Sequence, residues 1–412
     1  MRPRLCAPGT PARVARAARL ATLLVLAAGC RRGGGTPAGD PGVADRPVAA
    51  GAAAPCPPAA PAIRVACLAE AFRATLTPAQ RARVELPLTA ATAARWSNLP
   101  CGLSCRNGLE FRTLTAPQLA AALALAQGAL SAAGYGTFDA VRRADAYLGA
   151  QPRGRGGPGG PPPGSRPPPG GGPPGGGPAG GPPPGGPPGG GPPPGGGPPG
   201  GGYGDGIYVV AFLGTPSATG PWVLQLGGHH YAANLAFAGG AVTATPMFVG
   251  VEPVTFTVGG RTYAPLASRR DAIYGMLGAL DAGQRAAARL GAAFDDVLVG
   301  PGRDGRFPAP EGVLVGTLTP AQRARVAVAI AAWVDDLPNP DARALLAAYT
   351  SPAALAATRV AWAGAPTPTV QGAYVRLDGP RVWIEFACQN GVVLRGVHYH
   401  TIWRDKATDY GG

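Results

Sequence analysis

The chain has 412 residues, of which 36 are basic and 22 acidic, which gives a net charge of +14 at pH 7. Such a charge raises the question of nucleic-acid binding, but the arginines are dispersed and Lys406 is the only lysine. Five of the basic residues also fall in a predicted export signal. We therefore expect no nucleic-acid partner, although some attraction to anionic surfaces remains.

The first thirty residues predict an export signal. A basic stretch from Arg2 to Arg19 without an acid precedes an apolar stretch, Leu20 to Ala28, which is too short to span a bilayer as a mature helix. The ending LAAGC at 26–30 resembles a bacterial lipobox. We therefore expect a signal peptide over residues 1–29 and a lipid anchor on Cys30. Two or more acyl chains there would attach the protein stably to a membrane of the bacterial cell envelope. An ordinary signal peptide ending in cysteine is the alternative.

Two biased tracts divide the rest of the chain. Residues 30–61 are rich in Ala, Pro and Gly and lack periodicity, which predicts a disordered tether. Residues 153–205 are almost pure Gly and Pro without a strict Gly-X-Y period, which predicts a disordered insert and excludes collagen. Because loop-closure cost grows slowly with length, we expect one domain over 62–412. It has a helical part at 62–152 and a part with sheet and helices at 206–412.

Capping motifs in the sequence indicate where several helices begin. Thr77-Pro78-Ala79-Gln80 places Thr at the N-cap, Pro at the first helical position and Gln where a capping box requires it. The string TLTPAQRARV occurs at 75–84 and again at 317–326, and related starts begin at Thr115 and Asp281. We interpret these as repeated caps of similar amphipathic helices and predict neither a repeat domain nor an active site from them.

Strand signals follow the insert. Apolar or alternating runs separated by Gly-rich turns predict a mainly antiparallel sheet, and with the helices an α+β fold. Gly259-Gly260 is typical of a hairpin turn. The predicted strands are Ile207–Phe212, Trp222–Leu226, His230–Phe237, Val254–Val258, Arg381–Ala387 and Val392–Trp403.

Cysteine usage agrees with an oxidising compartment. Cys101 and Cys105 lie in a Pro/Gly-containing loop and favour a local disulfide, with Cys56 and Cys67 as a second pair. A zinc site from the same four is the alternative, but their spacing matches no standard zinc knuckle. Cys388, in a predicted strand, is expected to be a small buried residue.

The four histidines fall in two tight pairs, His229-His230 in GGHHY and His398-x-His400 in HYHTIWRD. Imidazole is the commonest metal ligand in proteins and titrates near neutral pH. Structural histidines would rarely cluster in this way. The pairs therefore predict a shared functional site, with packing in separate strands as the alternative.

The second pair lies in a predicted hairpin. Asn390-Gly391 between apolar runs is a strong hairpin signal, and a two-residue turn there would pair Gln389 with Val392. Continuing that register places Trp383 opposite His398.

This register puts Glu385, His398 and His400 on one face of the sheet, close enough for a carboxylate and two imidazoles to share an ion. Adjacent His229 and His230 cannot both face the same way in a regular strand. We expect one of them to join the site while the other packs or forms hydrogen bonds.

Three imidazoles, with or without Glu385, suit a divalent transition metal, which could be zinc, copper, iron or nickel. An open coordination position would activate water or bind dioxygen, whereas a closed one would be structural. The leading hypothesis is a metal-dependent enzyme of the cell envelope in which Glu385 and His400 act in catalysis. Glu252 in the PMFVGVEP segment is a further candidate carboxylate. The segment around Arg404 predicts a salt-bridged C-terminal clamp.

Other classes of function stay open. His400 and Glu385 also suit a metal-free acid/base site. A non-enzymatic protein that binds a metal or a small cofactor is a second class, and a surface scaffold using the Gly/Pro insert is a third. A small-molecule ligand fits either of the first two classes. Phosphate-binding Gly-rich loops and the Gly-x-Ser-x-Gly elbow are absent from the sequence.

A set of short stretches is distributed over the chain: RWSNLP at 95–100, RNGL at 106–109, LSAAGY at 130–135, FLGTP at 212–216, GHH at 228–230, PMFVG at 246–250, IEF at 384–386, HYHTIWRD at 398–405 and DYG at 409–411. Through these stretches the chain resembles domain-of-unknown-function family 3500, over about residues 65–412 apart from the insert. The resemblance implies a common fold and a shared His-rich site, and it supplies no reaction. The four cysteines at 56–105 depart from the family pattern, as does the insert.

Overall fold

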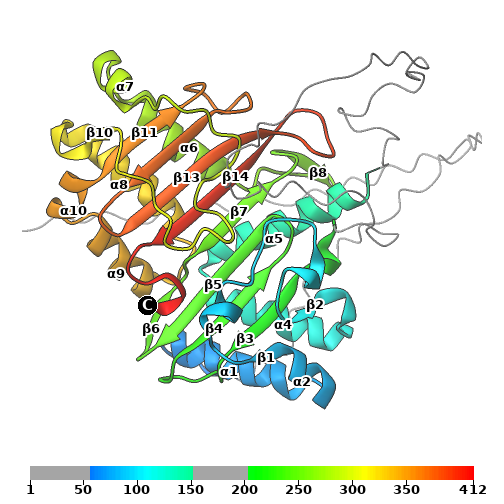
Figure 1. Ribbon diagram of the computed structural model, residues 1–412. Coiled ribbons are helices and arrows are strands. Elements are labelled where there is room, and N and C mark those ends of the chain that lie inside the picture. The colour runs from blue at the N-terminus through cyan, green and yellow to red at the C-terminus, as the bar shows by residue number, and fades with distance from the viewer. Residues whose placement is uncertain (1–55, 152–202) are drawn as a thin grey trace, which may run out of the picture. The chain divides into compact units, whose positions relative to one another are not determined.

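The computed structural model describes residues 56–151 and 203–412 (Figure 1). The predicted signal peptide, the lipobox cysteine Cys30, most of the tether and most of the insert lie outside these ranges. The described chain has the expected α+β fold, in which helices pack on a mainly antiparallel sheet. Within the same ranges, no helix is both long and apolar enough to cross a bilayer.

The first half of the described chain carries all its α-helices before its longer strands. Its helices are α1 (Pro61–Ala74), α2 (Pro78–Val84), α3 (Ala90–Ala93), α4 (Ala116–Ala129) and α5 (Ala132–Gly149), with 3-10 turns η1 (Gly102–Ser104), η2 (Phe111–Thr113) and η3 (Asp205–Ile207). Its strands are β1 (Glu85–Leu86), β2 (Leu109–Glu110), β3 (Val209–Leu213), β4 (Trp222–Gly227), β5 (Tyr231–Ala238), β6 (Ala241–Thr243) and β7 (Met247–Val251).

The second half follows a small separate hairpin, β8 (Phe256–Val258) and β9 (Arg261–Tyr263). Its helices are α6 (Ala267–Gly278), α7 (Ala282–Ala288), α8 (Pro320–Val334), α9 (Asn339–Tyr349) and α10 (Pro352–Ala357), with 3-10 turns η4 (Val315–Thr317) and η5 (Asp409–Gly411). Its strands are β10 (Val313–Leu314), β11 (Arg359–Ala363), β12 (Tyr374–Asp378), β13 (Val382–Asn390) and β14 (Val397–Asp405).

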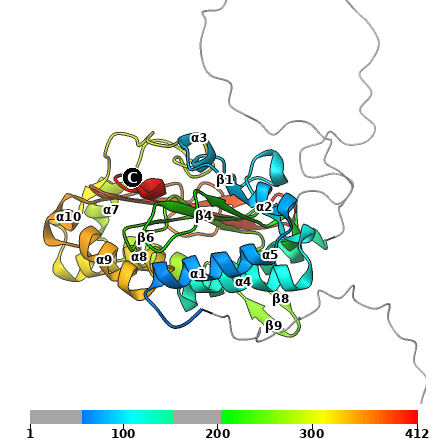
Figure 2. The same cartoon turned by 90° about the horizontal axis from the view of Figure 1, so that it is seen from below.

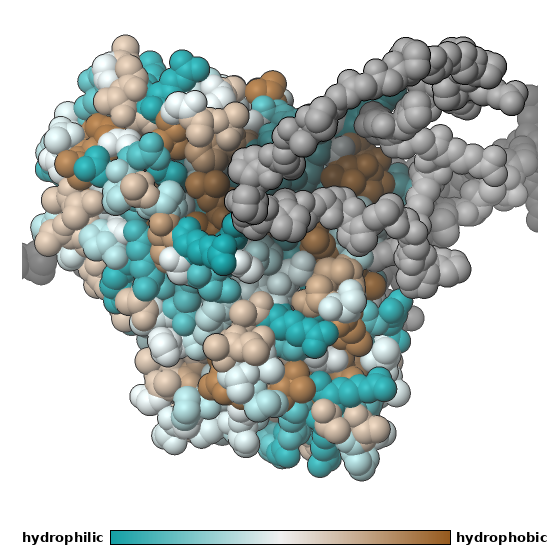
Figure 3. Space-filling model, in the orientation of Figure 1, coloured by the Kyte–Doolittle hydropathy of each residue, from teal (hydrophilic) through white to brown (hydrophobic). Residues whose placement is uncertain are grey.

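The main sheet runs in the order β1-β3-β4-β5-β7-β14-β13-β12-β11-β10, with β2 and β6 paired beside β3 and β5. Helices α1, α4, α5, α8 and α9 cover one face (Figure 2). Long loops cover the other face, over which hydrophilic and hydrophobic residues are interspersed (Figure 3). The larger apolar core lies under the helices, and a smaller one lies under the loops, around Trp96, Phe294 and Trp383.

The predicted helix starts are confirmed. Thr77, Thr115, Asp281 and Thr319 each form a capping box with the Gln three positions later. A cap of this kind satisfies backbone N–H groups that have no partner within the helix, and it stabilises the helix by about 1 kcal/mol. The Gly259-Gly260 turn is also confirmed, since it joins β8 to β9 with positive φ at both glycines.

The capping glutamines reveal an internal structural repeat. Gln80 and Gln118 exchange side-chain hydrogen bonds across 38 positions, and Gln284 and Gln322 exchange the same bonds across the same separation. Helices α2 and α4 of the first half therefore correspond to α7 and α8 of the second.

The glycines that precede β2 and β10 extend the repeat into the sheet. Gly108 and Gly312 both have positive φ, and a Cβ would lie 2.1 Å from the carbonyl oxygen of Val210 or 2.2 Å from that of Val360. Strand β2 pairs with β3 as β10 pairs with β11. The sheet therefore consists of two similar halves that meet where β7 pairs with β14.

The interpretation of the motifs as caps of similar helices is confirmed, and the structure adds that these helices occupy equivalent positions in the two halves. The sequence does not reveal this repeat, because its unit is long and the insert falls only in the first copy. The identical ten-residue strings also lie on non-equivalent helices, α2 and α8, so that aligning them gives the wrong correspondence.

The predicted two-residue hairpin turn is also wrong. Asn390 pairs with Val397 and Gln389 with His398, so residues 391–396 form the connection between β13 and β14. Glu252 explains the longer loop, because its Oε1 accepts backbone N–H bonds from Val393 and Leu394. The shift is an even number of residues, so the face on which each side chain lies is unchanged.

One of the two central strands is absent from the predicted set. Strand β7 (Met247–Val251) pairs with both β5 and β14. The segment is buried on both faces and therefore lacks alternation of polar and apolar residues. Pro246 and Pro253 beside it favour a loop when only the sequence is considered.

Candidate metal centre

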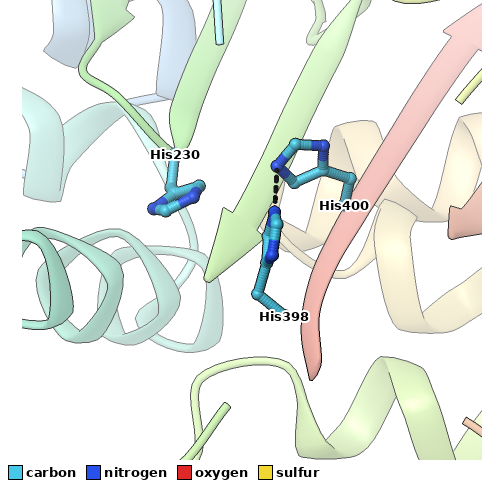
Figure 4. A group of neighbouring side chains, drawn as sticks. All are labelled: His230, His398 and His400. Carbon is cyan, nitrogen blue, oxygen red and sulfur yellow. Dashed lines mark hydrogen bonds between the residues drawn. The ribbon is translucent and has the colours of Figure 1, made fainter. Parts of the chain in front are cut away.

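Three histidines converge at the junction of the two halves (Figure 4). His398 and His400 project from β14, and His230 lies at the end of the turn that joins β4 to β5. All three are buried, and one ligand nitrogen from each lies within 4.8 Å of the other two. The prediction that one residue of the first pair joins the second pair therefore agrees with the geometry.

The distance between two of these nitrogens fits a small metal ion. Nε2 of His398 and Nε2 of His400 are 3.2 Å apart. A tetrahedral ion with bonds of 2.0–2.1 Å separates its ligand atoms by about 3.3 Å. The ring of His230 is further away, with its centroid 6.0 Å from the ring of His398 and 5.8 Å from that of His400.

Two carboxylates orient the imidazoles from behind. Asp145 Oδ1 on α5 lies 2.7 Å from Nδ1 of His230, and Asp296 Oδ1 in the loop after α7 lies 2.8 Å from Nδ1 of His400. Each carboxylate favours a proton on Nδ1, which leaves Nε2 of the same ring as the electron-pair donor. A carboxylate behind a histidine is the usual arrangement around metal-bound imidazoles.

Gly250 on β7 makes room for the cluster. A Cβ at this position would lie 2.8 Å from Cδ2 of His400 and 2.9 Å from Cδ2 of His230. The backbone N–H of Gly250 also donates a 2.7 Å hydrogen bond to the carbonyl oxygen of His230. The absent side chain therefore allows two imidazoles from opposite halves to approach over one strand.

The environment keeps the imidazole of His398 in the neutral form that binds metal. Burial lowers the pKa of His398 to about 3, and repulsion from His400 and His230 adds to this effect. Burial alone would raise the pKa of Asp296, but the adjacent His400 holds it below its usual value. A neutral imidazole beside an ionised carboxylate is the protonation state that metal binding requires.

Asp145 lies at the centre of a second group. Its Oδ2 accepts hydrogen bonds from the hydroxyl of Tyr208 at 2.8 Å and from the backbone N–H of His230 at 3.2 Å. Its Oδ1 faces Nδ1 of both His230 and His229, at 2.7 and 3.5 Å. Burial would raise the pKa of this carboxyl, but the two imidazoles hold it well below its usual range.

The structure does not bring Glu385 to the histidines. It lies on the same face, opposite Ile402, but its carboxylate accepts bonds from Leu298, Val299, Tyr374 and Trp383. Leu298 and Val299 lie in the loop after α7, Tyr374 lies on β12, and Trp383 lies on β13 with Glu385 itself. Burial raises the pKa of the carboxyl. The expected role of Glu385 as a ligand or base is not supported, because these donors occupy both of its carboxylate oxygens and it belongs to neither group of potential metal ligands.

Glu385 instead fixes the loop that carries Asp296. Two consecutive backbone N–H groups of that loop, at Leu298 and Val299, donate to the carboxylate. Arg404 holds the same loop by donating to the carbonyl oxygens of Val299 and Gly300. The loop is therefore anchored on its C-terminal side, directly after the residue that orients His400.

Glu252 is the candidate carboxylate that lies beside the site. Strand β7 ends at Val251, which pairs with Tyr399, and Glu252 is the next residue along the chain. Its Oε1 holds the 391–396 loop, while its Oε2 is buried and has no hydrogen-bond partner among residues 56–151 and 203–412. A buried carboxylate oxygen without a partner is costly, which marks Glu252 as a candidate functional residue.

The C-terminal clamp has the predicted ion pairs. Nη1 of Arg404 is 2.8 Å from both Asp304 and Asp409, and the hydroxyl of Tyr410 donates to Asp304 at 2.8 Å. Asp405 pairs with Arg381. The clamp is therefore structural and holds the loop over the sheet.

The cysteines form two disulfides, Cys56–Cys67 and Cys101–Cys105, while Cys388 is buried and free. Beside the second disulfide, the Arg106 guanidinium donates to the carbonyl oxygen of Gly228. This bond ties the disulfide loop to the turn that carries the first histidine pair.

Sequence reasoning missed Asp145, Asp296 and Gly250. Asp145 had a readable signal, because it lies on the buried stripe of α5 with Val141 and Leu148. An acid on the apolar stripe of a helix requires a buried partner. Asp296 and Gly250 have no comparable local signal, since each acts through residues that are distant in the sequence.

The fold and the site define a class of protein: a repeated α+β sheet with a buried cluster of histidines and aspartates at the junction of its halves, arranged in groups that can hold a metal ion. A family model described as "Protein of unknown function (DUF3500)" matches residues 58–412. The chain belongs to this family, which confirms the resemblance found in the sequence. No curated protein and no solved structure matches the chain.

Proposed function

We propose that this protein binds a divalent transition-metal ion through Nε2 of His230, His398 and His400. The observation that carries the proposal is the 3.2 Å separation of two Nε2 atoms, combined with carboxylates on the far nitrogens of His230 and His400. A single N–H···N hydrogen bond between the two rings gives the same separation, so metal loading is the measurement that distinguishes the two explanations.

Zinc is the ion that best fits this donor set. Three imidazoles at short separations suit a tetrahedral ion without a preferred geometry of its own, and metal-bound histidines usually carry a carboxylate or carbonyl on the other nitrogen. Copper and iron accept the same nitrogen donors, so loading experiments should include them.

We propose further that the centre is catalytic. Three protein ligands leave a fourth position, where a zinc ion lowers the pKa of water and supplies a nucleophile near neutral pH. Glu252, two residues after Gly250, is the carboxylate suited to accept a proton there, because its Oε2 is buried without a partner in the described chain. The resulting class is a metal-dependent hydrolytic enzyme. A closed site in a carrier or structural protein is the rival.

Metal analysis of the full-length chain, purified in detergent, tests the proposal. We expect bound zinc in the purified protein, or zinc uptake after chelation and reloading, and loss of that zinc in His398→Ala and His230→Ala. Arg381→Ala is the matched control, because Arg381 occupies the position in the second half that His230 occupies in the first. A protein that takes up no zinc, copper or iron after reloading contradicts the proposal.

The visible spectrum of the cobalt-substituted protein distinguishes an open catalytic site from a closed one. Cobalt substituted for zinc reports coordination number and anion binding in its visible spectrum. A spectrum that changes with added azide or at alkaline pH supports an open position, and Glu252→Gln should shift the alkaline transition. A spectrum unaffected by anions and pH supports a closed site.

We also propose that the protein is exported and lipid-anchored at the bacterial cell envelope through Cys30. The support is the basic and apolar N-terminal sequence that ends in LAAGC. Labelling with radioactive palmitate and fractionation of membranes test this. We expect label in the intact chain and none in Cys30→Ser, whereas equal label in both variants contradicts the anchor.

A further inference from the structure

We propose that the centre holds two metal ions and that His230 bridges them. The first ion is the one proposed above, so this inference rests on that function. The second ion would be bound by Nδ1 of His230, Nδ1 of His229 and Oδ1 of Asp145. These three atoms lie within 4.8 Å of one another, and all three residues are buried.

The two oxygens of Asp145 have different surroundings. Oδ2 is occupied by two donors, the Tyr208 hydroxyl and the backbone N–H of His230. Oδ1 faces the two imidazole nitrogens. A carboxylate that only oriented His230 would need a single contact at Oδ1. The second imidazole beside the same oxygen has no part in that role.

Nδ1 of His229 is the unexplained atom. It is buried, lies 3.5 Å from Oδ1 of Asp145, and has no hydrogen-bond partner in the described part of the chain. Burial, followed by repulsion from His230, lowers the pKa of His229 to about 3, so its ring is neutral at physiological pH. A buried unpaired nitrogen costs about 1–3 kcal/mol, which coordination to a metal would offset.

The distances allow an ion to fit after a small adjustment. Oδ1 of Asp145 is 2.7 Å from Nδ1 of His230 and 3.5 Å from Nδ1 of His229. These values bracket the separation of about 3.3 Å between ligand atoms of a tetrahedral ion. The edge of the Tyr203 ring packs against His229, with centroids 4.7 Å apart, and steadies the less constrained ligand.

The charges and protons balance. The first ion uses the electron pair on Nε2 of His230. The second ion displaces the proton from Nδ1 of the same ring, and that proton leaves to solvent. His230 then becomes an imidazolate, whose negative charge and that of Asp145 offset part of the charge of the two cations. No oxidation or reduction is involved.

The carboxylate on the other side of the cluster does not share these features. Asp296 contacts one imidazole, that of His400, and its side chain is 42% exposed. Because no second imidazole faces it, a proton on Nδ1 accounts for its contact. The proposal is therefore limited to two ions, with the second one on the Asp145 side.

Counting ions on the full-length, metal-free chain tests the proposal. Titration with zinc should give two ions bound per chain and one extra proton released with the second ion. His229→Ala should reduce the count from two to one. Copper loaded into both positions should show weakened electron paramagnetic resonance, because a bridging imidazolate couples the two spins. In His229→Ala, full intensity for one copper should return.

Each result separates the two proposals. One ion in the intact chain and one in His229→Ala overturns the second site and leaves the first intact. No ion in either protein overturns both. If His229→Ala binds two ions, or none while its thermal unfolding is unchanged, the assignment of His229 is overturned. If His229→Ala does not fold, Asp145→Asn, which keeps the shape of the side chain, replaces it and should also bind one ion.

Discussion

The two halves of the sheet share a backbone frame but differ in the residues at equivalent positions. The turn between β4 and β5 is closed by a bond from Gly228 N–H to Tyr231 at 2.7 Å, and the turn between β12 and β13 by one from Gly379 N–H to Val382 at 2.8 Å. The third residue of the first turn is His230, and the third residue of the second turn is Arg381.

A second pair of bonds extends this correspondence. Gly250 N–H donates to His230 at 2.7 Å, and Lys406 N–H donates to Arg381 at 2.8 Å. Lys406 and Arg381 then form ion pairs with Asp378 and Asp405. The second half therefore fills with charged side chains the place that the first half leaves open for imidazoles. A common frame supports either arrangement, and a few side chains decide which half contributes to chemistry.

The largest expected effect concerns the shared frame. Gly108→Val and Gly312→Val should each destabilise the protein by about 3–5 kcal/mol, because a Cβ would clash with a backbone carbonyl and φ is positive at both positions. Urea unfolding monitored by circular dichroism measures both. If one variant is tolerated while the other is not, the halves do not share this constraint.

The second effect concerns the difference between the halves. Gly250→Lys copies the residue at the equivalent position and should lower zinc affinity by more than about 100-fold, since its Cβ displaces the rings of His230 and His400. Competition with a chromophoric chelator gives the affinity. Lys406→Gly is the reverse change and should leave zinc binding within threefold. Zinc binding unaltered by Gly250→Lys would mean that the cluster is not the site.

The third effect is the pH dependence that two buried histidines contribute to stability. The pKa of His398 and of His229 is about 3 in the folded protein, against about 6.5 when unfolded. Between these values the unfolded chain binds more protons, so the free energy of unfolding of the metal-free protein should fall as pH decreases from 6.5 toward 3. The slope of the free energy of unfolding against pH should approach about 1.4 kcal/mol per pH unit for each of the two residues.

Urea unfolding at a series of pH values, with metal removed, measures this slope. His398→Asn should make the profile shallower, because one of the two groups no longer titrates. A flat profile from pH 6 to pH 4 in the unaltered protein contradicts the burial of neutral imidazoles.

The smallest effect returns to the common frame. Gln118→Ala and Gln322→Ala each remove a capping-box partner and a side-chain bridge, to α2 and to α7 respectively, and each should cost about 1 kcal/mol. Thermal unfolding measures both changes. A difference between them above about 1 kcal/mol would show that the repeat is structural in one half only.

The sequence was informative wherever the relevant contacts are local. The capping boxes and strands β3, β4 and β5 follow from residues a few positions apart, and each was predicted. Strand β7 was missed because it is buried on both faces between prolines. The register of β13 and β14 depends on Glu252, which is far away in the sequence.

The candidate site was predicted in part for the same reason. The pairing of the histidines was visible as a cluster of four, whereas the carboxylates that orient them come from a helix and a loop in different halves. Asp145 was recognisable only as an acid on the buried stripe of α5. Glu385 lies on the predicted face of the sheet, but its carboxylate is occupied by donors from a distant loop and from a neighbouring strand, which local sequence does not reveal.

The location of the cluster on β7 and β14 has a consequence for assembly. His230 belongs to one copy of the repeated frame, and His398 with His400 belongs to the other. Neither copy alone holds three imidazoles, so the centre exists only after both copies have folded and paired along their innermost strands. An ion bound there would act as a crosslink whose occupancy reports that this pairing is complete.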